Sequence, residues 1–148
     1  MSKFLETIHC PCAKVKKLDR ILTRGQDAVL SASGLTASQF STLRLLERVG
    51  PIVITEFAKL MAIDRSSLSR NLKIMDKAGW LTLTPYPHDI RNRLINITAK
   101  GTRLHRKAKK DWEIEQRFLL NAVGQKKLLE LNAMITEVAA LIEAGRNK

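Results

Sequence analysis

Hydroxyl, amide and cationic side chains crowd one short stretch of the sequence, residues 65–73. Such groups suit hydrogen bonding to the edges of bases and to phosphate oxygens, and arginine can hold a guanine through two hydrogen bonds at once. The serine side chains are short, so they would add little bulk between the backbone and a groove. The stretch therefore favours contact with nucleic acid through Arg65, Ser66, Ser67, Ser69, Arg70, Asn71 and Lys73.

The spacing of apolar residues predicts that this stretch is helical. Leu68, Leu72 and Met75 are four and three residues apart, which places them on one face of a helix. Asp64 can accept hydrogen bonds from the free N–H groups of the first turn, and Gly79 suits the left-handed position after the last turn. The polar side chains would then project from the other faces.

A β-hairpin is expected directly after this helix. Alternating residues predict strands at 80–84 and 94–97. The residues expected to break the first strand are Pro85, Pro87, His88 and Asp89. With Arg91 and Arg93 next to this break, the hairpin would have a basic tip, as in a winged helix-turn-helix. The alternative is a small α+β unit with a solvated basic face.

Helices are also expected before the hairpin unit. The apolar periodicity of residues 10–32 predicts one long helix. Thr36 and Gln39 form a capping-box pattern, in which a hydroxyl and an amide each satisfy an unpaired N–H at a helix start. The helix that follows should end near Gly50.

Two short elements lie between that helix and the polar stretch. Residues 52–54 are β-branched, which predicts a third strand beside the hairpin. Residues 56–61 would form the first helix of the helix-turn-helix. This helix is expected to hold the polar helix through Phe57 and Leu60.

The C-terminal third of the sequence predicts two helices. They carry more apolar residues than helices at the end of a small domain can bury within one chain. Thr98 can cap a helix that runs to about residue 122, and Gly124 separates it from the last helix. The main apolar stripe of that helix is Leu128, Leu131, Ile135, Val138 and Ile142. A second copy of the chain would cover this surface, since two-fold dimers are the commonest oligomers. Alternatively, the terminal helices pack only on each other.

Bulk composition narrows the class of protein. The 148 residues carry a formal charge of +12 and an isoelectric point near 10.2, which favours a polyanionic partner. No apolar run approaches the roughly 20 residues that span a bilayer, so we expect no membrane partner and a cytoplasmic protein. Two cysteines do not make a disulfide framework.

Several motifs together resemble the MarR (multiple-antibiotic-resistance regulator) family. Residues 34–40 (GLTASQF) resemble its characteristic helix start, and residues 55–58 (TEFA) with 64–70 (DRSSLSR) resemble its helix-turn-helix. Residues 89–93 (DIRNR) and 97–101 (ITAKG) resemble its wing. Each fragment is weak alone, but all of them occur in order at the family's spacing.

This resemblance implies a mostly α-helical homodimer with a small antiparallel β wing. Residues 1–34 would be the N-terminal dimerisation helix and residues 35–98 the winged DNA-binding domain. Residues 99–148 would supply the long C-terminal helix and a second dimerisation helix, as part of one structural unit. The resemblance also implies a transcriptional repressor that binds a pseudo-palindromic operator in double-stranded DNA. Release would follow binding of a small aromatic ligand or oxidation.

The match to the family also implies roles for single residues. Ser66, Ser67, Ser69 and Arg70 would read the major groove, and Arg91 would enter the flanking minor groove, where narrow A·T-rich segments concentrate negative potential. Asp89 would orient a wing arginine, or it is an ordinary turn aspartate. The cations better suited to phosphates, which set affinity and not sequence, are Lys59, Lys73, Lys77, Arg93 and Lys100.

The tetrapeptide from His9 to Cys12 offers a place to sense oxidants. Cys10 and Cys12 would lie at the start of the first helix, where a thiolate has a lowered pKa and reacts faster. The alternatives are that both thiols pack in the dimer interface, or that they bind a metal with His9. A structural zinc needs four donors, so we expect no metal and no other cofactor.

Other functions have less support. The histidines are scattered, and the sequence has no metalloprotease, serine-hydrolase or phosphate-loop motif, so we expect no enzyme. A basic winged helix that binds RNA or a protein without operator specificity remains an alternative. The small ligand would bind between the winged domain and the dimerisation helices, where Arg44, Arg48, Trp80 and Trp112 are candidates.

Overall fold

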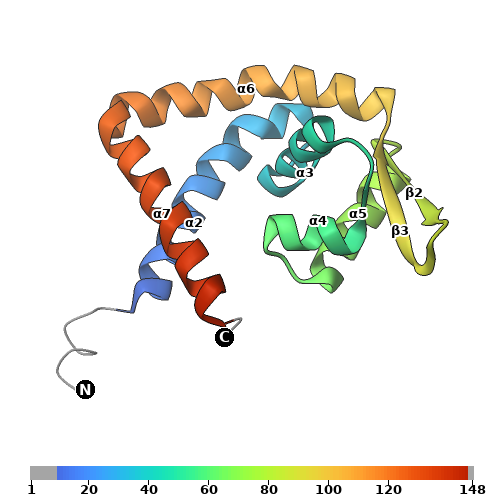
Figure 1. The fold of residues 1–148 in the computed structure, drawn as a ribbon. Coiled ribbons are helices and arrows are strands. Elements are labelled where there is room, and N and C mark those ends of the chain that lie inside the picture. Colours follow the sequence, from blue (N-terminus) through green and yellow to red (C-terminus); the bar gives the residue numbers. More distant parts are fainter. Residues whose placement is uncertain (1–9, 147–148) are drawn as a thin grey trace. The chain divides into compact units, whose positions relative to one another are not determined.

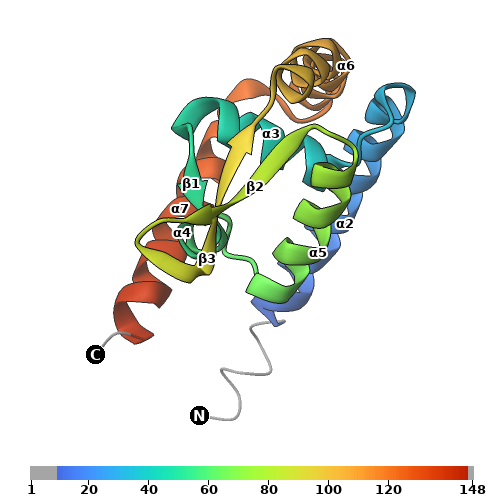
Figure 2. The same cartoon turned by 90° about the vertical axis from the view of Figure 1, so that its right-hand side faces the viewer.

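A computed structural model of the chain describes residues 10–146 (Figures 1 and 2). As the sequence predicts, the fold is mostly helical with a small antiparallel sheet. The elements, labelled as in Figure 1, are α2 (Pro11–Leu30), the 3₁₀ turn η1 (Ser31–Ser33), α3 (Ala37–Val49), β1 (Ile52–Val53), α4 (Ile54–Met61), α5 (Arg65–Lys77), β2 (Leu81–Tyr86), β3 (Asp89–Ile97), α6 (Ala99–Val123) and α7 (Gln125–Arg146). One compact unit ends at Trp112, and a second begins at Glu113.

The predicted helix starts are present in the structure. The Thr36 side chain accepts from the N–H of Gln39 at 3.2 Å, and the Gln39 side chain accepts from the N–H of Thr36 at 3.0 Å. Asp64 caps α5 by accepting from the N–H of Ser67 at 2.8 Å. Between α4 and α5 the chain turns sharply through Ala62, which has a left-handed backbone with φ of 49°. These local signals set the first turn of each helix before any tertiary contact is considered.

The hairpin is longer than the sequence predicted. Strand β3 lies between β1 and β2, with both neighbours antiparallel. Pro85 was expected to end the first strand, but it lies within β2 and pairs with Arg93, next to a register shift. Proline is tolerated there because β2 is an edge strand of this sheet, where a missing N–H donor costs little. The prediction of a basic tip on the hairpin is therefore wrong, because Arg91 and Arg93 lie along β3.

The strand predicted over residues 52–54 is shorter, because Ile54 already begins α4. The core of the first unit forms where α5 packs against α4 and the sheet. Leu68, Leu72 and Met75 on α5 are buried, and so is Phe57 on α4. The prediction that Leu60 also holds α5 is wrong, because its side chain is 61% exposed. Because α4 has only two turns, only one narrow face of it contacts the core, and that face carries Phe57 and Ala58.

The end of α5 and the start of α6 meet at one tight junction. Thr98 donates its N–H to the Trp80 carbonyl at 3.1 Å and its hydroxyl to the Gly79 carbonyl at 2.7 Å. The same hydroxyl accepts from the N–H of Gly101 at 3.0 Å, so it also caps α6. A Cβ added to Gly101 would lie 1.9 Å from the Trp80 carbonyl oxygen. Glycine is therefore required where the α6 backbone crosses the base of β2.

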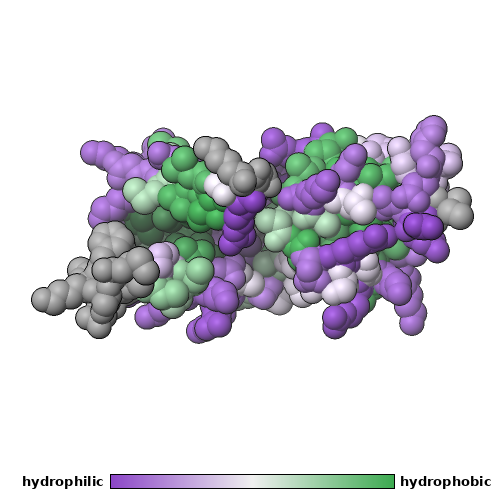
Figure 3. All heavy atoms as spheres, turned by 60° about the horizontal axis from the view of Figure 1, so that its bottom comes forward, coloured by the Kyte–Doolittle hydropathy of each residue, from purple (hydrophilic) through white to green (hydrophobic). Residues whose placement is uncertain are grey.

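The second unit comprises the last part of α6 and all of α7. Helix α7 has no buried residue, and ten large apolar side chains of this unit are exposed. They are Ile114, Phe118, Leu120, Val123, Leu129, Met134, Ile135, Val138, Leu141 and Ile142. Apolar side chains also gather on the molecular face drawn in Figure 3. Among the described helices, none combines the length and apolar character needed to cross a membrane.

Replacing Gly101 with alanine should destabilise the protein, because the new methyl group would collide with the Trp80 backbone. We expect the free energy of unfolding to fall by about 1–3 kcal/mol, the usual cost of overpacking. Urea denaturation of Gly101→Ala and the wild type would measure it. Gly145→Ala is the matched control, since nothing lies within 4 Å of its added Cβ. Equal stability of Gly101→Ala and the wild type would contradict the required close approach.

Candidate nucleic-acid interface

Helix α5 presents most of the predicted polar residues to solvent. Ser66, Ser67, Arg70 and Lys73 are exposed, whereas Ser69 is half-buried. Within residues 10–146, the side chains of Arg70 and Lys73 form no hydrogen bond or ion pair. These side chains are therefore available to an external ligand. The buried stripe on the opposite side of the helix keeps this face pointing outward.

The first turn of α5 is organised by Asp64. Its carboxylate accepts the Ser66 hydroxyl at 2.6 Å and the Ser67 N–H at 2.8 Å. The hydrogen bonds from the side chains of Ser66 and Ser67 hold the pKa of Asp64 well below its usual range. Ser66 is thus oriented by the protein, and its hydroxyl oxygen still has acceptor capacity toward solvent.

The wing is tied to α5 and α4 by two contacts that the sequence did not indicate. Arg65 donates from Nη2 to the Arg91 carbonyl at 3.0 Å, so its guanidinium joins the helix start to β3. Asn92 is 7% exposed and donates from Nδ2 to the Thr55 hydroxyl at 2.8 Å. Strand alternation places Arg91 and Arg93 on the face opposite to Asn92, and both arginines are exposed. The only sign of these contacts in the sequence is that the uncharged Asn92 lies between two arginines.

A groove of about 380 Å³ separates α5 from the wing. It brings together predicted residues from both elements with one acidic residue, Asp76. The lining residues are Ile54, Arg65, Ser69, Lys73, Asp76, Leu83, Arg91 and Arg93. Four cations against one carboxylate make this groove positive. The structure therefore brings the helix and wing candidates into one surface that suits a phosphate backbone.

Other predicted residues have more local roles. Asn71 is half-buried and donates to the Ser38 hydroxyl on α3 at 3.4 Å. Asp89 accepts from the Arg91 N–H at 3.0 Å, a turn contact that positions the backbone of the arginine. Among the expected phosphate partners, Lys100 donates to the Ala78 carbonyl at 2.8 Å and so caps the end of α5. Lys59 and Lys77 are exposed.

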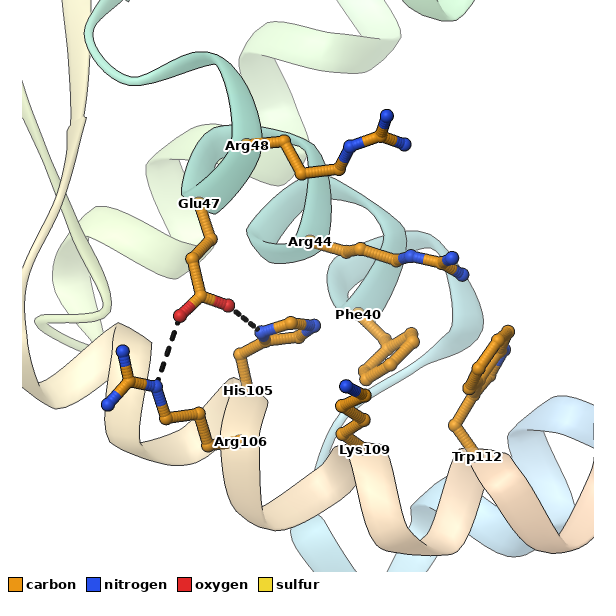
Figure 4. Close-up of a pocket in the computed structure, with 8 residues that line it drawn as sticks. All are labelled: Phe40, Arg44, Glu47, Arg48, His105, Arg106, Lys109 and Trp112. Carbon is orange, nitrogen blue, oxygen red and sulfur yellow. Dashed lines mark hydrogen bonds and ion pairs between the residues drawn. The ribbon is translucent and has the colours of Figure 1, made fainter.

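A second pocket, of about 300 Å³, lies between α3 and the first half of α6 (Figure 4). Of the four residues expected to bind a small ligand, Arg44, Arg48 and Trp112 line this pocket and Trp80 does not. The Arg44 guanidinium lies 4.5 Å from the centre of the Trp112 ring, which stacks on Phe40 with 5.9 Å between ring centres. The pocket thus combines aromatic surfaces with cations.

Sequence reasoning missed the buried polar centre of this pocket. His105 is 5% exposed, and its Nδ1 lies 2.5 Å from Glu47, which also accepts from Arg106 at 3.1 Å. Partial desolvation raises the pKa of Glu47, but the hydrogen bonds and electrostatic attraction of His105 and Arg106 together outweigh it and lower the pKa of the carboxyl group. Because the carboxylate only accepts, Nδ1 must carry a proton. The other ring nitrogen, Nε2, is buried without a hydrogen-bond partner within residues 10–146.

The N-terminal candidates lie at the edge of the described region. Cys10 and Cys12 are both exposed and reduced, and Cys10 is the residue before α2. His9 lies outside the described residues. Between residues 10 and 146, no three His, Cys, Asp or Glu side chains are grouped in a way that could hold a metal ion.

Comparison with known proteins shows which proteins the chain resembles. Residues 33–91, which carry α3 to α5 and the start of the wing, match the family model described as MarR family. Over this region the chain is similar to the MarR family. MarR of Salmonella typhimurium is 33% identical over 86 residues, 58% of this chain and 57% of that protein. The HTH-type transcriptional regulator PecS of Dickeya dadantii is 26% identical over 127 residues, 84% of this chain and 76% of that protein.

Solved structures share the fold over a longer range. The M. tuberculosis transcriptional regulator MosR has a TM-score of 0.79 and 28% identity, over 93% of this chain and 98% of that one. The structure of MosR in complex with DNA has a TM-score of 0.78 and 29% identity, over 90% of this chain and 98% of that one. By sequence, the chain spans 57% of the length of the curated MarR relatives named above. The predicted MarR-family resemblance and winged-helix fold are thus confirmed.

The Asp64 network predicts a pH dependence of stability. Because the folded-state pKa of this carboxyl group is lowered, its stabilising effect is complete above the unfolded pKa, near 4, and is lost as the pH falls below it. Asn at position 64 also caps a helix but does not titrate. We expect thermal denaturation to show that the wild type loses stability relative to Asp64→Asn between about pH 5 and pH 2. If the stabilities of the wild type and Asp64→Asn changed equally with pH, the network would not favour the ionised carboxyl group.

Proposed function

We propose that the chain is a sequence-specific DNA-binding transcriptional regulator and not an enzyme. The observation that carries this proposal is the pairing of an exposed polar face on α5 with two outward wing arginines across one positive groove. The complex of the related MosR with DNA supports it. In this proposal α5 enters the major groove and β3 presents Arg91 to the adjacent minor groove. A regulator of this kind works where the chromosome is, in the cytoplasm.

Within this surface we assign direct base reading to Arg70, Ser67 and Ser66. Arg70 is exposed and has no protein partner among the described residues, so its guanidinium can make the bidentate contact to guanine. Arg65 is held by the wing and is better suited to a phosphate. Lys59, Lys73, Lys77 and Arg93 are exposed cations around the same surface and would also contact phosphates.

We propose further that the regulator is a homodimer. The second unit exposes ten large apolar side chains, and α7 buries none of its residues within the described chain. Soluble proteins cover apolar surface of this extent with a partner. Helix α2 adds Val15 and Ile21, at 59% and 55% exposed. A two-fold dimer through residues 1–34 and 99–148 would present two copies of α5 to half-sites about one helical turn apart, ~34 Å.

Replacing Arg70 with alanine should weaken binding to the operator by about 1–3 kcal/mol, the value of one bidentate arginine–guanine contact. The operator would be obtained by selecting bound sequences from a random duplex pool, and a palindromic consensus is the result expected of a dimer. Binding to a random duplex should change less, because that binding rests on phosphates. Lys59→Ala is the control, with a similar loss on both duplexes.

Equal losses for Arg70→Ala on the operator and the random duplex would contradict base reading by this residue. Tighter wild-type binding to structured RNA than to any duplex would favour the alternative, a basic winged helix without operator specificity.

We also propose that the regulator is a repressor released by a small aromatic acid in the α3–α6 pocket. The carboxylate would lie near Arg44 and Arg48, and the ring against Trp112 and Phe40. The buried Nε2 of His105 would gain the hydrogen-bond partner that it lacks within the described chain. The volume of about 300 Å³ suits a ligand with a single ring.

Thiol oxidation is the other proposed route of release. Cys10 and Cys12 are exposed, so peroxide can reach both sulfurs. Their positions at the start of α2 allow oxidation there to alter the dimer helices that follow. The two routes depend on residues far apart in the sequence, so separate variants can distinguish them.

Benzoate should lower the operator affinity of the wild type by about 5- to 150-fold, the usual range of coupling between sites. Arg44→Gln should remove this response, because the exposed guanidinium that attracts the carboxylate is lost. If the thiols sense oxidants, mild peroxide should release the wild type and Arg44→Gln but not the double variant Cys10→Ser/Cys12→Ser. Fluorescence anisotropy of labelled operator would measure each case. A wild type that responds to neither compound would contradict both routes.

A further inference from the structure

The first half of α6 carries more positive charge than α5, the recognition helix of the proposed function. Residues 99–110 contain six lysines and arginines and no acidic residue, so half of the net charge of +12 lies in these twelve residues. Helix α5 has four cations against Asp76, a net charge of +3. Residues 111–146 have four cations and six acidic residues. This concentration is a local feature of α6 and not a general property of the chain.

Half of these cations already have a role within the protein. Lys100 caps α5, Arg106 pairs with Glu47, and Lys109 lines the α3–α6 pocket. Arg103, Lys107 and Lys110 are exposed and form no ion pair or hydrogen bond within the described region. They are four and three residues apart, so they share one face of the helix. We refer to these three residues as the α6 cation stripe.

The stripe continues the surface of the winged domain. Helix α6 follows β3 after a single residue, and Figures 1 and 2 both show it leaving the end of that strand. Its first turn is fixed to the end of α5 by the contacts of Thr98 and Lys100. Arg103 therefore lies about one turn beyond the junction of the recognition helix and the wing.

The chemistry of the stripe favours the backbone of a nucleic acid over a protein or a membrane surface. Protein interfaces have an apolar core, and helices that lie on membranes have an apolar face. Within residues 99–112, no large apolar side chain is exposed. Duplex DNA needs only cations at the spacing of phosphates. The seven steps of helix rise from Arg103 to Lys110 span about 10 Å along the helix, close to the rise of three base pairs.

We propose that the α6 cation stripe binds phosphates of the DNA that flanks the operator, beyond the bases read by α5 and the wing. The stripe would thereby lengthen the bound DNA and draw its ends toward the body of the dimer. This inference rests on the proposed function, because it assumes a protein already seated on an operator. The stripe would add affinity without sequence preference.

The test uses the full-length triple variant Arg103→Gln/Lys107→Gln/Lys110→Gln, in which glutamine preserves helix propensity. Affinity is measured against salt on the selected operator alone and on the operator extended by about two helical turns, ~20 base pairs, at each end. The wild type should show a steeper salt dependence on the long duplex, by at most about −5 in log–log slope for a dimer. The triple variant should lose this extra slope and still bind the short operator as the wild type does.

The matched control is the triple variant Arg117→Gln/Lys126→Gln/Lys127→Gln, which removes the same amount of charge from the second unit. It should keep the extra slope on the long duplex. The inference is overturned if wild-type slopes are equal on both duplexes, or if both triple variants lose the same amount. It is also overturned if the stripe variant loses only binding to phosphatidylserine vesicles. Absence of wild-type binding to any duplex would overturn the proposed function together with this inference.

Discussion

The close approach of Gly101 to the Trp80 carbonyl is the contact on which the winged unit depends. It allows Thr98 to serve the end of α5 and the start of α6 with one side chain. Because the Thr98 side chain is bonded to the backbone on both sides of the junction, α5 cannot move relative to the first turn of α6 without breaking at least one of these bonds. His105 lies one turn further along α6, so a displacement of the α3–α6 pocket would reach α5 through this junction.

A single buried amide performs a comparable task for the wing. Asn92 would be costly to bury without a partner, and the Thr55 hydroxyl supplies one. The contact with Thr55 holds Asn92 on one face of β3, and the alternation of side chains then places Arg91 and Arg93 on the opposite face, which Ile95 shares. The direction of Arg91 and Arg93 therefore follows from a polar contact on the other face of the strand. The carbonyl of Arg91 then receives Arg65, which joins the wing to α5.

Local signals in the sequence predicted what local chemistry determines. The Asp64 cap, the Thr36–Gln39 capping box and the buried stripe of α5 depend on residues within a few positions of each other, and the structure confirms them. The prediction that Pro85 ends the first strand was wrong, because the effect of proline on a strand depends on whether the strand is at an edge. Only the order of strands in the sheet reveals this. The pairing of Glu47 with His105 joins residues 58 positions apart. No periodicity or spacing rule brings such residues together, so the polar centre of the pocket could not be predicted.

The distribution of charge and apolar surface along the chain would let the two proposed associations, with a second copy of the chain and with DNA, coexist. Cations are concentrated before residue 111, whereas exposed large apolar side chains dominate the second unit. A partner copy needs apolar surface with little like-charge repulsion, and residues 111–146 have a small net negative charge of −2. A duplex needs unpaired cations, and apolar neighbours would add nothing to its phosphate contacts. Because the two demands fall on different segments, substitutions that change DNA affinity need not change dimer stability, and the two can be measured separately.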